Sequence, residues 1–228
     1  MLRRLLKPDA EIFTLEDPVR YPIAGVTQIE FNRAAGMTLA ASLKLILKQD
    51  PHTVYLEEIR DGESAALAVQ TALSNRRFLS SVNSTDAAGA IARLIEMGTD
   101  RFTLASALSA SISQRLVRTI CTSCREPYEP SEQVLVSLGL ESMAGGRFFR
   151  GTGCDACRNT GLKGRTALFE LLVSDNELRE TILGGADASG IRAAAERDGN
   201  FRPLRQDAVN KVLQGIIGLE EAVTAMKS

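Results

Sequence analysis

The chain has 228 residues, of which 44% are hydrophobic and 24% charged, which is typical of a soluble protein with one or two domains. Its 27 Lys and Arg residues are balanced by 28 Asp and Glu residues, and this lack of a basic excess argues against a nucleic-acid partner. The opening MLRRLLKPDA has no apolar run of signal-peptide length, and no segment approaches a membrane span, so we expect a cytoplasmic protein. The single histidine excludes a site built on several histidines.

Strands and helices alternate along the first 98 residues. The predicted strands are 11–18, 53–59 and 77–83, and the predicted helices are 38–50, 62–74 and 86–98. The first of these helices carries Leu39, Leu43 and Ile46 at helical spacing, and Pro51 ends it. Such alternation predicts an α/β fold whose mainly parallel sheet is covered by helices.

The remainder of the chain has a different texture. A helix is predicted from about residue 103 to residue 120, a short helix near 131–139, a strand at 165–172, and short helices after it. Residues 121–165 hold all four cysteines and seven glycines. The opening MLRRLLKP is typical of the tail of a helix, so either a short helix starts the domain or an earlier strand–loop–helix unit is missing.

The four cysteines form two C-x-x-C pairs. Cys121 and Cys124 make the first pair, Cys154 and Cys157 make the second, and the 29 residues 125–153 separate them. Four thiolates from two such pairs can surround one zinc ion tetrahedrally. Disulfides are disfavoured without an export signal, and a redox pair explains only one of the two motifs. With no open coordination position, the predicted zinc site is structural.

Acidic and polar residues follow the ends of the three predicted strands. They are Glu16 and Asp17; Glu57, Glu58, Arg60 and Asp61; and Asn83, Ser84, Thr85 and Asp86. The carboxyl ends of parallel strands meet at one sheet edge, where ligands bind. This rim suits Mg²⁺ and a water nucleophile. Acids also cap the helices that follow strands, and Asp86 is well placed as an N-cap, so both interpretations stay open.

Several motifs in a fixed order resemble the second half of the secretion ATPases that drive type II secretion and type IV pilus assembly. TLEDPVRY resembles their aspartate box, LEEIRD their Walker B region, and SSVNSTDAAGAIARLIEMG their histidine box. SQRLVRTICTSCREPY and GCDACRNTGLKGRTALFELL resemble the metal-binding part. The resemblance covers nearly the whole chain and implies a RecA-like sheet, incomplete at its N-terminal side, with a tetracysteine zinc-binding insertion and a helical C-terminal part.

The chain departs from this family at five places, one of which is Lys48, where the family often has arginine. The phosphate-binding loop G-x-x-x-x-G-K-[ST] does not occur in the 228 residues. Asn83 stands at the histidine of the histidine box. Glu57 stands at the glycine before the Walker B acid, which adds a carboxylate where phosphates would lie. Asn75 occupies a turn where a glycine is expected.

The resemblance also implies roles for residues of the rim. Glu58 would hold or orient Mg²⁺ and its water, and Glu16 would polarise the attacking water. Asp17 would lie beside the nucleotide and metal, while Arg60 and Asp61 would brace the Walker B turn. Asn83 could hydrogen-bond the γ-phosphate or its sensor. ATP and magnesium are thus the implied cofactors, in addition to the zinc expected at the cysteines.

The sequence predicts three parts: a partial RecA-like core at 1–120, a zinc-binding subdomain at 121–165, and a C-terminal strand and helices at 166–228. The resemblance implies a hexameric ring at the cytoplasmic face of the inner membrane, in contact with platform proteins of a secretion or pilus system. One hypothesis is that the chain is part of a motor ATPase and is inactive alone. The alternative is a non-catalytic, zinc-stapled module that binds subunits of the secretion machinery.

Overall fold

A computed structural model describes residues 1–137, 139–140, 146–197 and 199–227. The chain divides into two compact units. Unit 1 comprises Met1–Ser111 and Val173–Asn200, and unit 2 comprises Ile112–Leu172 and Phe201–Ser228. Each unit has its own hydrophobic core.

Unit 1 contains a parallel sheet of four strands in the order β2-β1-β3-β4. These strands are β1 (Ile12–Glu16), β2 (Thr27–Glu30), β3 (Thr53–Glu58) and β4 (Arg77–Ser81). The predicted parallel α/β architecture is therefore confirmed. Strand β2 was not predicted, because its short sequence TQIE lies at the edge of the sheet and has no apolar alternation.

Helices of unit 1 begin where the sequence supplies capping side chains. They are α1 (Leu39–Leu47), α2 (Gly62–Leu73), α3 (Ala87–Glu96), α4 (Arg101–Ala107), α6 (Asn176–Leu183) and α7 (Ala188–Arg197), with 3₁₀ turns at Leu2–Arg4 and Arg33–Ala35. Thr38 caps α1, Asp61 caps α2 and Asp86 caps α3, each through a hydrogen bond from a backbone N–H in the first turn. The prediction that Asp86 is an N-cap is confirmed.

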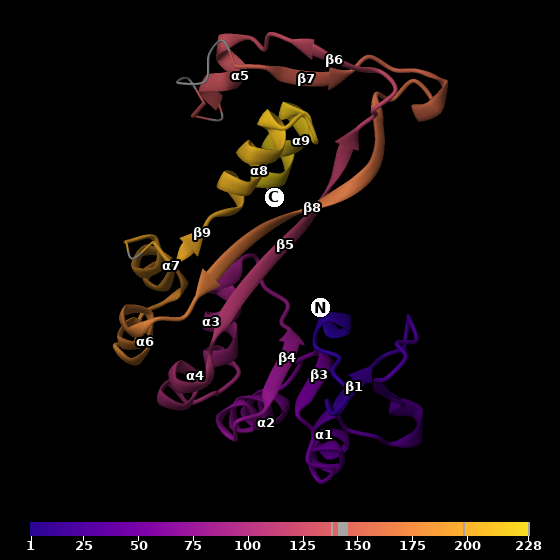
Figure 1. The fold of residues 1–228 in the computed structure, drawn as a ribbon. Coiled ribbons are helices and arrows are strands. Elements are labelled where there is room, and N and C mark those ends of the chain that lie inside the picture. The colour runs from indigo at the N-terminus through magenta and orange to yellow at the C-terminus, as the bar shows by residue number, and fades with distance from the viewer. Residues whose placement is uncertain (138, 141–145, 198, 228) are drawn as a thin grey trace. The chain divides into compact units, whose positions relative to one another are not determined.

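The core of unit 1 lies between the sheet and the helices α1 and α2, which run side by side in Figure 1. Leu43 and Ile46, two of the residues predicted at helical spacing, are fully buried there. They pack with Leu15, Val54 and Leu56 from the central strands. This packing fixes the central strands β1 and β3, whose carboxyl ends carry the acidic residues.

Unit 2 contains nearly all of two long strands and a separate hairpin. Strands β5 (Ala110–Ile120), β8 (Leu162–Val173) and β9 (Phe201–Arg202) form a sheet in the order β5-β8-β9, and β6 (Arg125–Tyr128) pairs antiparallel with β7 (Phe148–Gly151). The helices are α5 (Glu132–Ser137), α8 (Leu204–Leu213) and α9 (Leu219–Lys227), and a 3₁₀ turn spans Asp155–Cys157. Helices α8 and α9 lie together (Figure 1), and Val212 and Leu219 from them are buried in the core with Leu168 of β8.

The prediction of one helix from residue 103 to residue 120 is wrong. The structure ends α4 at Ala107 and starts β5 at Ala110. Along β5, burial alternates from residue 110 to residue 118, with Ser111 and Val117 inside and Ile112 and Leu116 exposed. Its β-branched residues favour a strand, and the alternation has the period of a strand rather than of a helix. Strands β6, β7 and β9 were also not predicted.

Candidate functional site

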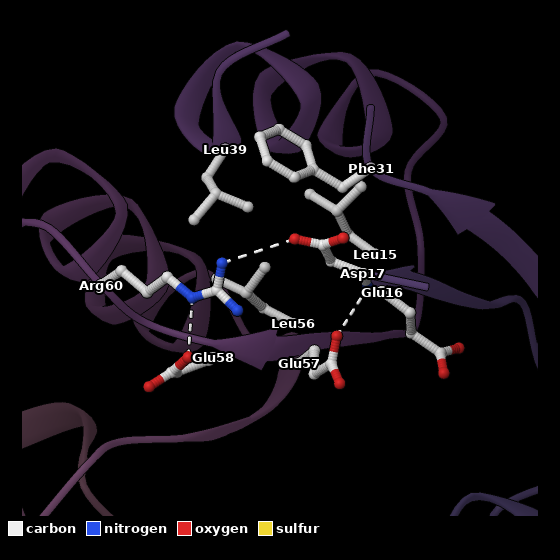
Figure 2. A pocket seen from close by; sticks show the side chains of 9 residues that line it. All are labelled: Leu15, Glu16, Asp17, Phe31, Leu39, Leu56, Glu57, Glu58 and Arg60. Carbon is white, nitrogen blue, oxygen red and sulfur yellow. Dashed lines mark hydrogen bonds and ion pairs between the residues drawn. The ribbon is translucent and has the colours of Figure 1, made fainter. Parts of the chain in front are cut away.

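The carboxyl ends of β1, β3 and β4 meet at one edge of the unit 1 sheet. Leu15 is paired with Leu56, and Leu56 with Ser80, so these three neighbouring strands end at about the same level. A hollow at this edge, about 190 Å³ including space continuous with solvent, is lined by Leu15, Glu16, Asp17, Phe31, Leu39, Leu56, Glu57, Glu58 and Arg60 (Figure 2). The structure therefore brings together most of the residues predicted for the site.

Arg60 lies between two of the predicted carboxylates. Its Nε donates to Oε2 of Glu58 over 2.6 Å, and its Nη1 lies 3.5 Å from Oδ2 of Asp17 (Figure 2). The hydrogen bond to Glu58 raises the pKa of Arg60, so the guanidinium stays charged. Arg60 thus links the end of β3 to the residue that follows β1.

Glu16 has a different set of partners. Its Oε1 accepts hydrogen bonds from Oγ1 of Thr14 over 2.6 Å and from Nε2 of Gln28 over 2.8 Å. In Figure 2 its carboxylate points away from Arg60. Thr14 and Gln28 were not among the predicted site residues. The spacing of Thr14 and Glu16 on a strand, two residues apart and therefore on one face, is the signal that could have identified Thr14.

Three other predicted residues lie around this edge in different ways. Asp61 accepts the backbone N–H of Ser64 over 2.8 Å and begins α2. Asp86 accepts the N–H of Gly89 over 2.7 Å and also pairs with Arg192 of α7 over 2.9 Å. Asn83 is exposed on the segment between β4 and α3. The capping interactions give Asp61 and Asp86 a structural role, whatever else they do.

Glu57 is engaged with the loop that follows β1. Its Oε2 accepts the backbone N–H of Asp17 over 2.6 Å, and its Oε1 lies 3.7 Å from Nη2 of Arg20. Its main-chain carbonyl accepts the hydroxyl of Ser81 over 2.5 Å. The sequence pattern alone gave no signal for this contact, because residues 17 and 57 are brought together only by the pairing of β1 with β3.

The four cysteines lie together in unit 2, as predicted. Their Sγ atoms are all within 4.8 Å of one another, and no disulfide joins them. Three separations are 3.9 Å for Cys121–Cys154, 3.8 Å for Cys124–Cys157 and 3.7 Å for Cys154–Cys157. Sulfurs at about 2.3 Å from a central zinc ion in a tetrahedron are separated by about 3.8 Å. The thiols therefore fit a tetrahedral metal ion.

The hairpin β6–β7 explains how the two C-x-x-C motifs meet. One motif precedes β6 and the other follows β7, so pairing these strands closes the long gap between them. The backbone carbonyl of Gly161 also accepts the N–H of Cys121 over 2.9 Å. A Cβ atom at Gly151 would lie 2.0 Å from that same carbonyl oxygen, so this close backbone approach requires glycine.

Backbone donors tune the thiols of the second motif. Burial by itself would raise the pKa of Cys157, but hydrogen bonds from the backbone N–H groups of Cys154 and Gly161 outweigh it and lower the pKa to about 6. These N–H groups lie 3.2 Å and 3.3 Å from its Sγ. Burial raises the pKa of Cys124 to about 11. N–H donors aimed at sulfur favour the thiolate form that binds metal.

Comparisons with known proteins agree with this architecture. Residues 1–224 match the family described as Type II/IV secretion system protein. The type IV pilus assembly ATPase PilB of Thermus thermophilus is 42% identical over 225 residues, which are 98% of this chain and 25% of that protein. The type II secretion system protein E of Dickeya dadantii is 40% identical over 227 residues, which are 99% of this chain and 45% of that protein.

A solved structure shares the fold. The ATPase DotB of Yersinia pseudotuberculosis superposes with a TM-score of 0.70 at 19% identity, covering 100% of this chain and 53% of that one. The chain thus spans less than half the length of the two relatives, 25% for PilB of Thermus thermophilus and 45% for protein E of Dickeya dadantii. With its fold and nearly all its residues matched, the chain belongs to the type II/IV secretion system protein family.

Proposed function

We propose that this chain is the part of a secretion or pilus-assembly motor ATPase that places the metal ion and the attacking water. One observation carries the proposal: in a member of this family, the ends of β1 and β3 bring Glu16, Asp17 and Glu58 to a single sheet edge. Glu58 would hold or orient Mg²⁺ and its water, and Glu16 would polarise that water. Arg60 and Asp61 would brace the turn after β3, and Asn83 would approach the γ-phosphate.

The 228 residues alone are not expected to hydrolyse ATP. Phosphoryl transfer is catalysed by positioning and by stabilising charge on the transferring group. The sequence G-x-x-x-x-G-K-[ST], whose backbone N–H groups and lysine cradle phosphates, does not occur in the chain. Losing one hydrogen-bond donor that stabilises the transition state costs about 10²–10³ in rate. Here several donors to the phosphates would have to come from another polypeptide segment.

The motor would work as a homo-oligomer, a hexameric ring, at the cytoplasmic face of the inner membrane against platform proteins. None of the helices in the described part of the chain is long and apolar enough to cross a bilayer. The functional division that we propose is a core at 1–120, a zinc-binding subdomain at 121–165 and a C-terminal part at 166–228. This division differs from the two compact units, which place residues 112–120 in unit 2 and residues 173–200 in unit 1. The zinc-binding subdomain would staple the fold through Cys121, Cys124, Cys154 and Cys157.

A second candidate is a non-catalytic module that binds subunits of the secretion machinery. Glu57 and Asn83 favour it, because they replace the glycine and the histidine that the family resemblance implies at the nucleotide site. In this case the acidic edge would have no catalytic task.

The first test is phosphate release by the purified chain with Mg²⁺ and ATP. We expect no turnover above background for the wild type, for Glu58→Gln or for the control Glu63→Gln. Glu63 serves as the control because its exposed side chain, on α2, pairs with Lys44 of α1. Turnover that disappears in Glu58→Gln but persists in Glu63→Gln would contradict the expected inactivity.

A chimera separates the two candidates. Residues 1–224 would replace the matching segment of the type II secretion system protein E of Dickeya dadantii, which is the longer protein. Hydrolysis that Glu58→Gln abolishes and Glu63→Gln leaves intact is the expected result for a motor part. A folded chimera without hydrolysis, even after Asn83→His, would favour the non-catalytic module.

A further inference from the structure

The loop after β1, residues 17–26, contains no helix or strand. Strand β1 ends at Glu16, and Asp17 is followed by Pro18, which has no backbone N–H to donate. A candidate catalytic carboxylate therefore lies at the junction of a rigid strand and a loop that lacks ladder hydrogen bonds. The direction of Asp17 depends on how this loop is held.

Two carboxylates hold the loop from opposite sides. On the β3 side, Glu57 accepts the N–H of Asp17 over 2.6 Å. On the β2 side, Glu30 accepts the N–H of Val19 over 3.4 Å. The Glu57 bond is much the shorter, and a short hydrogen bond to a carboxylate is about twice as strong as a neutral one. Glu57 is therefore the closer of the two carboxylates and holds the start of the loop at Asp17. Gln28 holds the later part of the loop, because it accepts the N–H of Ile23 over 2.7 Å and donates to the carbonyl of Tyr21 over 3.1 Å.

A bulge in β3 places Glu57 for this contact. The pairing of β3 with β4 shifts register between Leu56 and Glu58, so Glu57 lies at the irregular position. Its carbonyl is held by the hydroxyl of Ser81 on β4, while its side chain reaches toward β1 (Figure 2). Bulges of this kind redirect a side chain beside functional sites.

The ion pair with Arg20 is the weaker part of the arrangement. Its atoms are 3.7 Å apart, and the Arg20 side chain is 69% exposed against 25% for Glu57. An exposed pair at this distance is screened by solvent and contributes little. Of the two contacts that Glu57 makes with this loop, the hydrogen bond to Asp17 is thus the stronger one.

We propose that Glu57 is a positioning residue, which fixes the Asp17 backbone so that the Asp17 carboxylate faces the site and Arg60 in one orientation. The proposal rests on the proposed function for the role of that site, but the loop attachment itself does not. Glu57 acts through the backbone of its neighbour strand and does not need to touch nucleotide or metal. An acceptor oxygen at this position is what the loop requires, and the negative charge of Glu57 strengthens that hydrogen bond.

Amide exchange of Asp17 in the 228-residue chain tests the attachment, by NMR and without any nucleotide. Glu57→Ala should speed exchange of the Asp17 amide by about tenfold or more, because one charge-assisted hydrogen bond is lost. Glu57→Gln keeps an acceptor oxygen and should retain most of the protection. Glu63→Ala is the matched control and should change nothing at Asp17. Unchanged protection in Glu57→Ala, or equal loss in Glu57→Gln, would overturn the proposal.

The chimera described above tests the consequence for the reaction. We expect Glu57→Ala to lower the rate of hydrolysis and Glu57→Gln to restore most of it, because glutamine keeps the acceptor oxygen. An unchanged rate in Glu57→Ala would overturn the positioning role. A chimera that is inactive with Glu57 intact would count against the proposed function, while the amide measurement would still decide whether Glu57 fixes the loop.

Discussion

Single side chains at the acidic edge are defined by the partners they already have. Glu58 and Asp17 share Arg60, whereas Glu16 is bonded to Thr14 and Gln28. Four carboxylates at one edge would repel one another, and these contacts give the carboxylates different hydrogen-bond donors and cations as partners. The chemistry available to each carboxylate thus depends on neighbours that come from different strands.

Asn75 is a second residue whose role follows from local geometry. The turn before β4 places it in the left-handed region, with φ of 60°, where a glycine was expected from the sequence. Asn tolerates this conformation better than other residues with a Cβ atom. Asn75→Ala should therefore lower the free energy of unfolding by about 1 kcal/mol, while Asn75→Gly should stay within a few tenths. Urea unfolding of the three proteins measures this, and equal stability of all three would contradict it.

Among the helices, α3 is tied to α7 through its capping residue. Asp86 accepts the Gly89 N–H and pairs with Arg192, whose side chain is about a third exposed. Asn is an equally good N-cap, so Asp86→Asn isolates the ion pair, with an expected cost below about 1 kcal/mol. Asp86→Ala removes the cap as well and should cost about 1 kcal/mol more.

The stability difference between the wild type and Asp86→Asn is expected to depend on pH. Burial raises the pKa of Asp86, but the hydrogen bonds from Gly89 and Arg192 outweigh it, so the folded pKa lies below its ordinary value. Its stabilising effect is therefore complete above the unfolded pKa of about 3.9, and it is lost as the pH falls through the folded pKa. The difference in unfolding free energy between wild type and Asp86→Asn should shrink below about pH 4. A difference that stays constant from pH 6 to pH 2 would contradict this.

The elements that were predictable carry local signals. Helices α1 to α3 have capping side chains and apolar spacing, and β1, β3 and β4 alternate with them. Strand β5 was predicted as a helix, because its apolar residues also fit a helical spacing. Its β-branched residues and its pairing with β8 select the strand. The hairpin β6–β7 is likewise fixed by contacts across a long gap. The cysteine cluster was predictable from spacing, whereas the contact of Glu57 with Asp17 depends on strand order.

The two units have separate cores, and the cysteine cluster lies in only one of them. We expect one zinc ion per chain in reduced protein, by elemental analysis, since the sulfur separations fit a tetrahedral site. Removing the metal with a chelator should increase hydrogen exchange within 121–165 and leave the sheet of unit 1 protected, because structural zinc contributes folding free energy locally.

Two variants sharpen this zinc experiment. Cys154→Ser should lose the metal and reproduce the effect of the chelator, while the exposed neighbour Thr122→Ser should keep both metal and protection. Absence of metal from carefully prepared wild-type protein would contradict the zinc assignment. Exchange that rises equally in both units would contradict its local action.

The interleaved path of the chain through the two units has a consequence for synthesis on the ribosome. The strands of the unit 1 sheet all lie within residues 12–81, so that sheet can form early as the chain emerges. Unit 2 is different, because Ala208, Val212 and Leu219 of its core belong to α8 and α9, at the far end of the sequence. The cysteines emerge long before the helices that complete their unit. During translation, metal binding therefore either follows the synthesis of α8 and α9 or stabilises the cysteine region before the core of unit 2 is complete.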